Sequence, residues 1–97
     1  MKRREMVGEL LRSARHQKGE SLRSAAVGLD VDPSYLSRVE SGEKPPSDAF
    51  QRAASDYYGL SRDQVHLAAG DVPDDIIRLL QRNPQLIDEL RSRYGEQ

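Results

Sequence analysis

The sequence contains no cysteine and no long apolar run, and its positive and negative charges nearly balance. The absence of cysteine excludes disulfide bonds and thiolate metal sites, and it is compatible with a reducing compartment. Because no apolar stretch approaches the length of about 20 residues that a membrane-spanning helix needs, no membrane association is expected. The first residues also lack the apolar core of a signal peptide. These absences favour a cytoplasmic protein.

Signatures of catalysis and of bound cofactors are missing as well. The sequence has no phosphate-cradling glycine loop, no nucleophile elbow and no metal-binding motif. The two histidines, His16 and His66, are far apart and have no carboxylate at ligand spacing. The adjacent acidic pairs Asp74-Asp75 and Asp88-Glu89 point apart on a helix, so they cannot act together. We therefore expect no enzyme activity, no metal and no cofactor.

The balance of charge does not favour nucleic-acid binding, but its distribution does not exclude it. The net charge is −1, whereas a strongly basic domain would be the easiest sign of a nucleic-acid partner. Residues 1–45 carry nine Lys and Arg against seven Asp and Glu, and residues 71–97 carry four against six. The positive excess therefore lies in the N-terminal half and the acidity in the tail.

The pattern of apolar residues predicts an all-α protein with a modest core. The chain has 97 residues, of which 36% are hydrophobic, so one small domain is expected, and oligomerisation would add buried surface. No segment alternates with period two for long enough to be a strand. Glycines follow the apolar segments, as they commonly do at helix ends. Five helices are predicted before residue 70, over about 4–18, 21–29, 32–41, 47–58 and 61–69. The fourth should turn inward Phe50, Ala53, Ala54 and Tyr57.

Two of these helices are short and closely joined in the stretch Ser21–Gly42, SLRSAAVGLDVDPSYLSRVESG. The first begins after Ser21, a good N-cap residue, and the second begins after Asp32, with Pro33 at a position where the missing N–H costs nothing. Helices this short and this tightly joined must cross steeply, which is the geometry of a helix-turn-helix. The second helix exposes small polar groups and one guanidinium, from Ser34, Ser37, Arg38 and Ser41. Such a face suits the major groove of DNA.

Residues 32–42, DPSYLSRVESG, resemble the recognition helix of the phage repressor and Cro family of helix-turn-helix regulators, also called Xre-type. The resemblance covers about Val7 to Ala69 and implies a five-helix repressor-like domain. The chain departs from the family pattern at three positions: Glu20 and Ala25 replace leucines, and Asp30 replaces a turn glycine. Aspartate tolerates the left-handed conformation of such a turn better than most residues.

Arg38 is the strongest candidate for a base contact. It lies opposite the apolar residues Leu36 and Val39, and its guanidinium can bind O6 and N7 of guanine. The resemblance implies that Pro33 and Ser34 occupy positions from which related proteins reach bases, where proline can offer only an apolar contact. The residues expected to face the bases are Pro33, Ser34, Ser37 and Arg38.

Phosphate contacts are expected from both ends of the motif. The N–H groups at the start of the first motif helix, around Ser21, Leu22 and Arg23, should face a phosphate, and Arg23 adds a positive charge. Ser41 and Lys44 match phosphate contacts of the family, so the resemblance implies the same role for them.

The resemblance also implies a structural ion pair. Arg15 and Glu40 match the arginine–glutamate pair with which the family ties the first helix to the end of the recognition helix. We expect Glu40 to hold the guanidinium in a partly buried bridge. The alternative is two independent surface charges, since exposed ion pairs contribute little to stability.

The sequence changes character after Gly70. Pro73 and Asn83-Pro84 each start a short helix, so residues 71–97 are predicted to form a helical extension of the DNA-binding domain of residues 1–70. The extension is rich in large apolar side chains, which usually means that a partner covers them. We expect a homodimer interface formed by Ile76, Ile77, Leu80, Leu86, Leu90 and Tyr94. The alternative is that these side chains pack against their own domain.

These features favour a dimeric, sequence-specific regulator that binds a double-stranded DNA operator. Two recognition helices would read a near-palindromic site, and the family resemblance implies a repressor. The rival prediction is an antitoxin-like interaction module whose main partner is a toxin, because the same fold serves antitoxins and the acidic, apolar tail would suit a protein partner. No pocket for a small effector is apparent in so short a chain.

Overall fold

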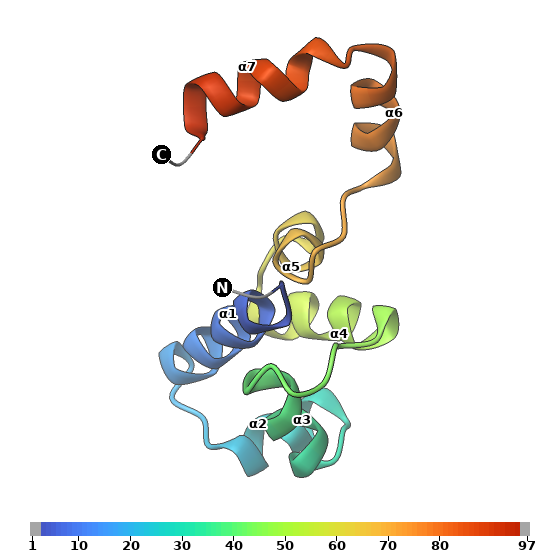
Figure 1. The fold of residues 1–97 in the computed structure, drawn as a ribbon. Coiled ribbons are helices and arrows are strands. Elements are labelled where there is room, and N and C mark those ends of the chain that lie inside the picture. The colour runs from blue at the N-terminus through green and yellow to red at the C-terminus, as the bar shows by residue number, and fades with distance from the viewer. Residues whose placement is uncertain (1–2, 96–97) are drawn as a thin grey trace.

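The computed structural model describes residues 3–95, and side chains from Met6 onward. These residues form seven α-helices and no strand, which confirms the predicted all-α class (Figure 1). Their bounds lie within a residue or two of the predicted ones. In chain order the helices are α1 (Arg3–Gln17), α2 (Leu22–Leu29), α3 (Pro33–Glu40), α4 (Asp48–Tyr58), α5 (Arg62–Ala68), α6 (Asp74–Arg82) and α7 (Gln85–Tyr94).

The helix-turn-helix formed by α2 and α3 begins and turns where the local sequence dictates. Ser21 Oγ accepts a hydrogen bond from the backbone N–H of Ser24 at 3.1 Å, and Asp32 Oδ1 accepts one from that of Ser34 at 2.8 Å. Both bonds satisfy N–H groups that the start of a helix leaves without a partner. Between the two helices Asp30 adopts the left-handed conformation, with φ 57° and ψ 46°. The turn therefore keeps the family geometry without a glycine.

The core is formed by side chains of α1 to α5, which lie together in the lower body of Figure 1. Ala25, at a position where the family usually has leucine, is fully buried. Several core members are small, so the core is modest, as the composition predicts. The buried core consists of Val7, Leu11, Ala25, Ala26, Leu29, Leu36, Val39, Phe50, Ala54 and Val65.

One predicted core residue of α4 is wrong. Ala53 is exposed and lies at the edge of an apolar groove of about 810 Å³, between the α2–α3 turn and α4. Gln51 is buried instead, because the inward face of α4 is set by Phe50 and Ala54 and a helix places residue 51 on that same side. The Gln51 amide is satisfied there, since its Nε2 donates to the Pro46 carbonyl at 3.1 Å.

The C-terminal helices α6 and α7 stand apart from the five-helix body and pack mainly against each other (Figure 1). Their large apolar side chains are uncovered, with exposed fractions of 40% for Ile76 and Ile77, 50% for Leu90 and 75% for Tyr94. Leu80 and Leu86 are half-buried. The structure therefore does not show these side chains packed against their own domain, which was the alternative.

The predicted start of the last helix is wrong in detail. Asn83 does not cap α7: its side-chain amide turns back and donates to the Leu79 carbonyl at 3.0 Å, so it closes the end of α6. Helix α7 begins after Pro84 without a side-chain cap. The carbonyl groups of the last turn of α6 lie within hydrogen-bond distance of the Asn83 side chain, so that side chain bonds to α6 instead of capping α7.

Candidate nucleic-acid interface

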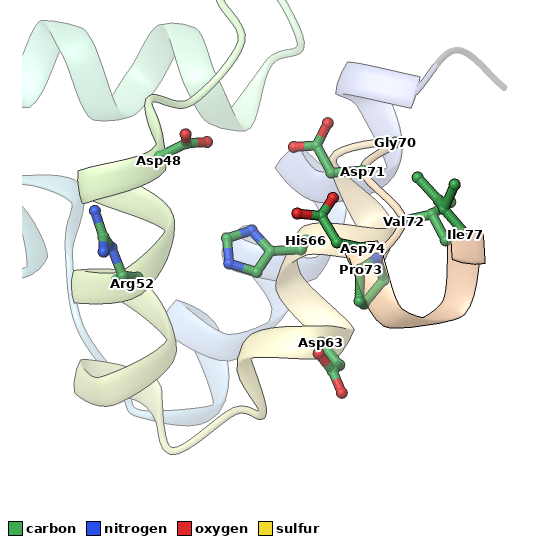
Figure 2. Close-up of a pocket in the computed structure, with 10 residues that line it drawn as sticks. All are labelled: Asp48, Arg52, Asp63, His66, Gly70, Asp71, Val72, Pro73, Asp74 and Ile77. Carbon is green, nitrogen blue, oxygen red and sulfur yellow. The ribbon is translucent and has the colours of Figure 1, made fainter. Parts of the chain in front are cut away.

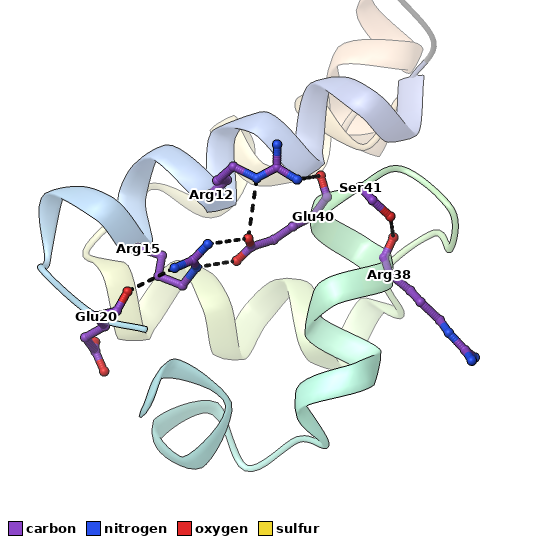
Figure 3. A network of polar contacts seen from close by, with 6 residues as sticks. All are labelled: Arg12, Arg15, Glu20, Arg38, Glu40 and Ser41. Carbon is purple, nitrogen blue, oxygen red and sulfur yellow. Dashed lines mark hydrogen bonds and ion pairs between the residues drawn. The ribbon is translucent and has the colours of Figure 1, made fainter. Parts of the chain in front are cut away.

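The outward face of α3 is a polar row with one cation. Ser34 and Arg38 are one turn apart and exposed, and Ser41 follows at the end of the helix on the same side. Pro33 and Ser37 are exposed as well. The Arg38 side chain extends away from α1 and the rest of the body (Figure 3). The structure thus brings together, on one surface, the four residues expected to face bases.

Hydroxyl groups at the two ends of α3 are already committed to partners within the protein. The Ser34 hydroxyl donates to Asp32 Oδ1 at 2.7 Å, and the Ser41 hydroxyl donates to the Arg38 carbonyl at 3.0 Å. A phosphate oxygen can only accept a hydrogen bond. In this rotamer Ser41 therefore has no proton for a phosphate, and its hydroxyl must first leave the carbonyl.

The start of α2 is arranged differently. Ser21 uses its hydroxyl oxygen as an acceptor for the cap, which leaves the hydroxyl proton available to a phosphate. Leu22 is half-buried, so only its backbone N–H can serve an outside partner, whereas Arg23 is exposed. Lys44, after α3, is also exposed, with its Nζ 5.6 Å from the centroid of the Tyr35 ring. Apart from Leu22, these expected phosphate contacts therefore have side chains exposed to solvent.

A buried ion pair fixes α3 from behind. Arg15 Nε and Nη2 donate to the two carboxylate oxygens of Glu40, both at 2.9 Å, and the two residues are only 8% and 3% exposed (Figure 3). The hydrogen bond to Glu40 raises the pKa of Arg15. Arg15 Nη1 also donates to the Glu20 carbonyl at 3.0 Å. The two charges are therefore one bidentate pair that joins α1 to the end of α3.

Arg12 adds a second cation to this pair, one that the sequence pattern did not predict. Its Nη2 donates to the Glu40 backbone carbonyl at 3.3 Å, and its Nε lies 3.6 Å from Glu40 Oε1. A cation is favourable there because the last carbonyl groups of a helix carry partial negative charge. The only signal in the sequence was the position of Arg12, three residues before Arg15 on the same face of the helix.

Comparison with known proteins identifies the family of this domain. A protein family described as helix-turn-helix domain matches residues 7–68, almost the range over which the sequence resembles the repressor and Cro family. The chain belongs to this helix-turn-helix family. None of the described helices is long and apolar enough to cross a membrane.

Relatives of this helix-turn-helix protein are named as regulators rather than enzymes. The transcriptional regulator ClgR from two strains of Mycobacterium tuberculosis, CDC 1551 and H37Rv, is 37% identical to it over 68 residues. The match covers 70% of this chain and 61% of those relatives. The solved structure of the clp gene regulator ClgR from Corynebacterium glutamicum is 29% identical, with a TM-score of 0.63. That similarity covers 99% of this chain and 98% of the other.

One departure from the family pattern, Glu20, forms hydrogen bonds within this helix-turn-helix domain. Glu20, at a usual leucine position, accepts a hydrogen bond from the Tyr57 hydroxyl at 2.6 Å and one from Ser24 Oγ at 2.9 Å. The bond from Tyr57 is the main cause of a lowered pKa of Glu20 and of a raised pKa of Tyr57. Gly28 leaves room for this bond, because a Cβ there would stand 2.4 Å from the Tyr57 oxygen.

A second concave surface lies where α4, α5 and the start of α6 meet. It is an open cleft of about 720 Å³ whose wall includes four carboxylates, Arg52 and His66 (Figure 2). His66 Nδ1 is hydrogen-bonded to Gln51 Oε1. Among the described residues no three potential ligands are grouped to hold a metal. The cleft is acidic, which makes it unsuitable for DNA. Its carboxylates are Asp48, Asp63, Asp71 and Asp74.

Proposed function

We propose that this protein is a sequence-specific DNA-binding transcription regulator, and specifically a repressor, that places α3 in the major groove. The observation that carries the proposal is the exposed polar face of α3, with Arg38 directed outward, on a helix that a buried ion pair fixes from behind. Membership of the helix-turn-helix family and the names of the relatives support it.

In this proposal the base contacts and the phosphate contacts come from different parts of the motif. Arg38 binds guanine, and the small residues of α3 approach neighbouring bases. The start of α2 binds a phosphate on one side of the groove, and the segment after α3 binds one on the other side, once the Ser41 hydroxyl has turned. The base contacts are Pro33, Ser34, Ser37 and Arg38. The phosphate contacts are Ser21, Leu22, Arg23, Ser41 and Lys44.

We further propose that α6 and α7 form a homodimer interface. Their exposed apolar side chains are too many for a surface in water, and Figure 1 has these helices at the end of the molecule opposite α2 and α3. An interface at that end leaves both α3 helices free for DNA. Two recognition helices about 34 Å apart would then read a near-palindromic operator. The interface residues are Ile76, Ile77, Leu80, Leu86, Leu90 and Tyr94.

The proposal is tested by selecting bound sequences from a random duplex library and titrating the selected duplex with salt. A specific complex should lose affinity steeply, with a slope of log Kd against log salt close to the number of phosphates that Lys and Arg side chains neutralise. A duplex of scrambled sequence serves as the control and should bind more weakly at every salt concentration. If no duplex binds even at low salt, the rival, an antitoxin-like module with a protein partner such as a toxin, is favoured instead.

A further inference from the structure

Asp32 and Ser34, at the start of α3, form a hydrogen-bonded unit with a fixed polarity. Asp32 Oδ1 accepts both the backbone N–H of Ser34 at 2.8 Å and its hydroxyl at 2.7 Å. An ionised carboxylate can only accept, so the hydroxyl must be the donor. The same bonds lower the pKa of Asp32, with the hydroxyl of Ser34 as the main cause. The carboxylate is therefore ionised in neutral solution.

This polarity leaves the unit with acceptors only on its outer side. The single hydroxyl proton of Ser34 is used internally, and the oxygen keeps a lone pair for an outside donor. Asp32 Oδ2 has no hydrogen-bond partner among the described residues, and both side chains are exposed. Arg38, one turn further along the same face, is the opposite case, because a guanidinium can only donate. Helix α3 thus presents hydrogen-bond acceptors at its start, from Asp32 and Ser34, and hydrogen-bond donors further along, from Arg38.

The major-groove edges of the bases also differ in whether they present hydrogen-bond donors or acceptors. Adenine N6 and cytosine N4 present amino donors, whereas guanine O6 and thymine O4 present acceptors. An accepting unit therefore attracts an amino base and repels a keto base. In a helix-turn-helix complex the first residues of the recognition helix contact base edges. Asp32 and Ser34 are therefore placed to distinguish amino bases from keto bases.

We propose that Asp32 is a specificity-determining residue, which together with Ser34 selects an amino base, adenine or cytosine, at one position of each operator half-site. This inference rests on the proposed function, and it adds a residue so far regarded only as a helix cap. Asp32 then has two roles: Oδ1 caps α3 and orients the Ser34 hydroxyl, and Oδ2 faces the base. Its negative charge is tolerated beside DNA because the positive end of the helix dipole lies there.

The test compares base preferences selected from a random duplex library by the full chain and by three variants. Asp32→Asn keeps an oxygen for the cap but can turn an amide donor outward, and Ser34→Ala removes the hydroxyl acceptor. Asp30→Asn is the matched control, because it removes the same charge two residues earlier, and asparagine also tolerates the left-handed conformation of that exposed residue. Far-UV circular dichroism and thermal melting verify that each variant folds.

The wild type is expected to select adenine or cytosine at one half-site position. Asp32→Asn should reduce that preference on the order of tenfold or shift it toward guanine or thymine, and Ser34→Ala should weaken it. Asp30→Asn should change overall affinity but no base preference. The inference is overturned if the wild type selects a defined operator and Asp32→Asn selects the same bases at every position. A wild type that selects no sequence would overturn the proposed function itself, which is a distinct result.

Discussion

Gly8 of α1 lies directly against the backbone of Glu40 at the end of α3. A Cβ at position 8 would stand 2.4 Å from the Glu40 carbonyl oxygen and 2.7 Å from that of Val39. No side chain other than hydrogen fits this approach without moving backbone. The close approach is also what lets Arg12 and Arg15, one and two turns further along α1, reach Glu40. The position of α3 therefore depends on a glycine in a different helix.

Gly8→Ala should destabilise the protein. Alanine favours a helix over glycine by about 1 kcal/mol, but the clash is with backbone atoms and must push α1 away from α3, at a cost of about 1–3 kcal/mol or more. We expect a lower Tm in thermal unfolding followed by circular dichroism. Ser13→Ala, at an exposed position of the same helix, is the control and should leave Tm unchanged or slightly higher. A Tm increase for Gly8→Ala would show that α1 adjusts without loss.

Glu40→Ala should destabilise the protein by about 3–5 kcal/mol, because it leaves the buried guanidinium of Arg15 without its partner. Glu40→Gln should cost less, since it keeps one acceptor oxygen. Denaturant unfolding of both variants, of Arg15→Ala and of the double variant gives the coupling energy of the pair.

The Asp88 and Arg91 pair on α7 is the matched control for that cycle. Its charged atoms are 3.6 Å apart, but the side chains are 86% and 76% exposed. Their coupling energy should be close to zero, because water screens exposed pairs. A coupling for Arg15 and Glu40 that is no larger than this would contradict a structural role.

Tyr57→Phe should lower stability in a pH-dependent way. Its hydroxyl holds the pKa of Glu20 below the ordinary value of 4.5, so this stabilisation is present above that pH and is lost as pH falls through the folded-state pKa. The difference in Tm between wild type and variant should therefore be largest near neutral pH and should shrink in acid. The raised pKa of Tyr57 implies that the difference also shrinks in strong alkali.

Tyr35→Phe is the control for that pH series. The Tyr35 hydroxyl accepts a hydrogen bond from the backbone N–H of Ser47 at 3.2 Å, with no carboxylate involved. Its loss should lower Tm by a similar amount in acid and at neutral pH. Parallel curves for the two variants would argue against the Glu20 bond as the cause.

Arg38→Ala should reduce specific DNA binding by about 1–3 kcal/mol and leave non-specific binding nearly intact. The reason is that a base contact is made only on the correct sequence, whereas a phosphate contact is made on any. Anisotropy titrations with the selected and the scrambled duplex at one salt concentration measure both. Arg52→Ala, an equally charged change at the acidic cleft of α4, is the control and should alter neither strongly. Equal losses on both duplexes would make Arg38 a phosphate contact.

A fragment ending at Gly70 should fold and sediment as a monomer. All buried core residues lie between Val7 and Val65, and α6 and α7 pack mainly against each other. Its binding to a palindrome should fall sharply, because two linked half-sites gain avidity that a single one lacks. Sedimentation at matched concentrations compares the fragment with the full chain. A fragment that aggregates would mean that α6 and α7 complete the core, and a dimeric fragment would place the interface on other helices, such as α4 and α5.

The sequence alone determined the starts of α2 and α3 and the helix-turn-helix that they form. Ser21 and Asp32 cap their helices through hydrogen bonds to residues two or three positions away. The left-handed conformation of Asp30 is a matter of its own φ and ψ angles. The outward row with Arg38 follows from helical periodicity. Interactions of this range depend only on neighbouring residues, so they can be predicted without knowing the fold.

Tertiary structure decided which distant groups meet. Gly8, Arg12 and Glu40 are brought together only by the packing of α1 on α3, and Glu20 finds Tyr57 across 37 positions. The family pattern suggested the Arg15–Glu40 pair, but not the second arginine or the glycine that admits it.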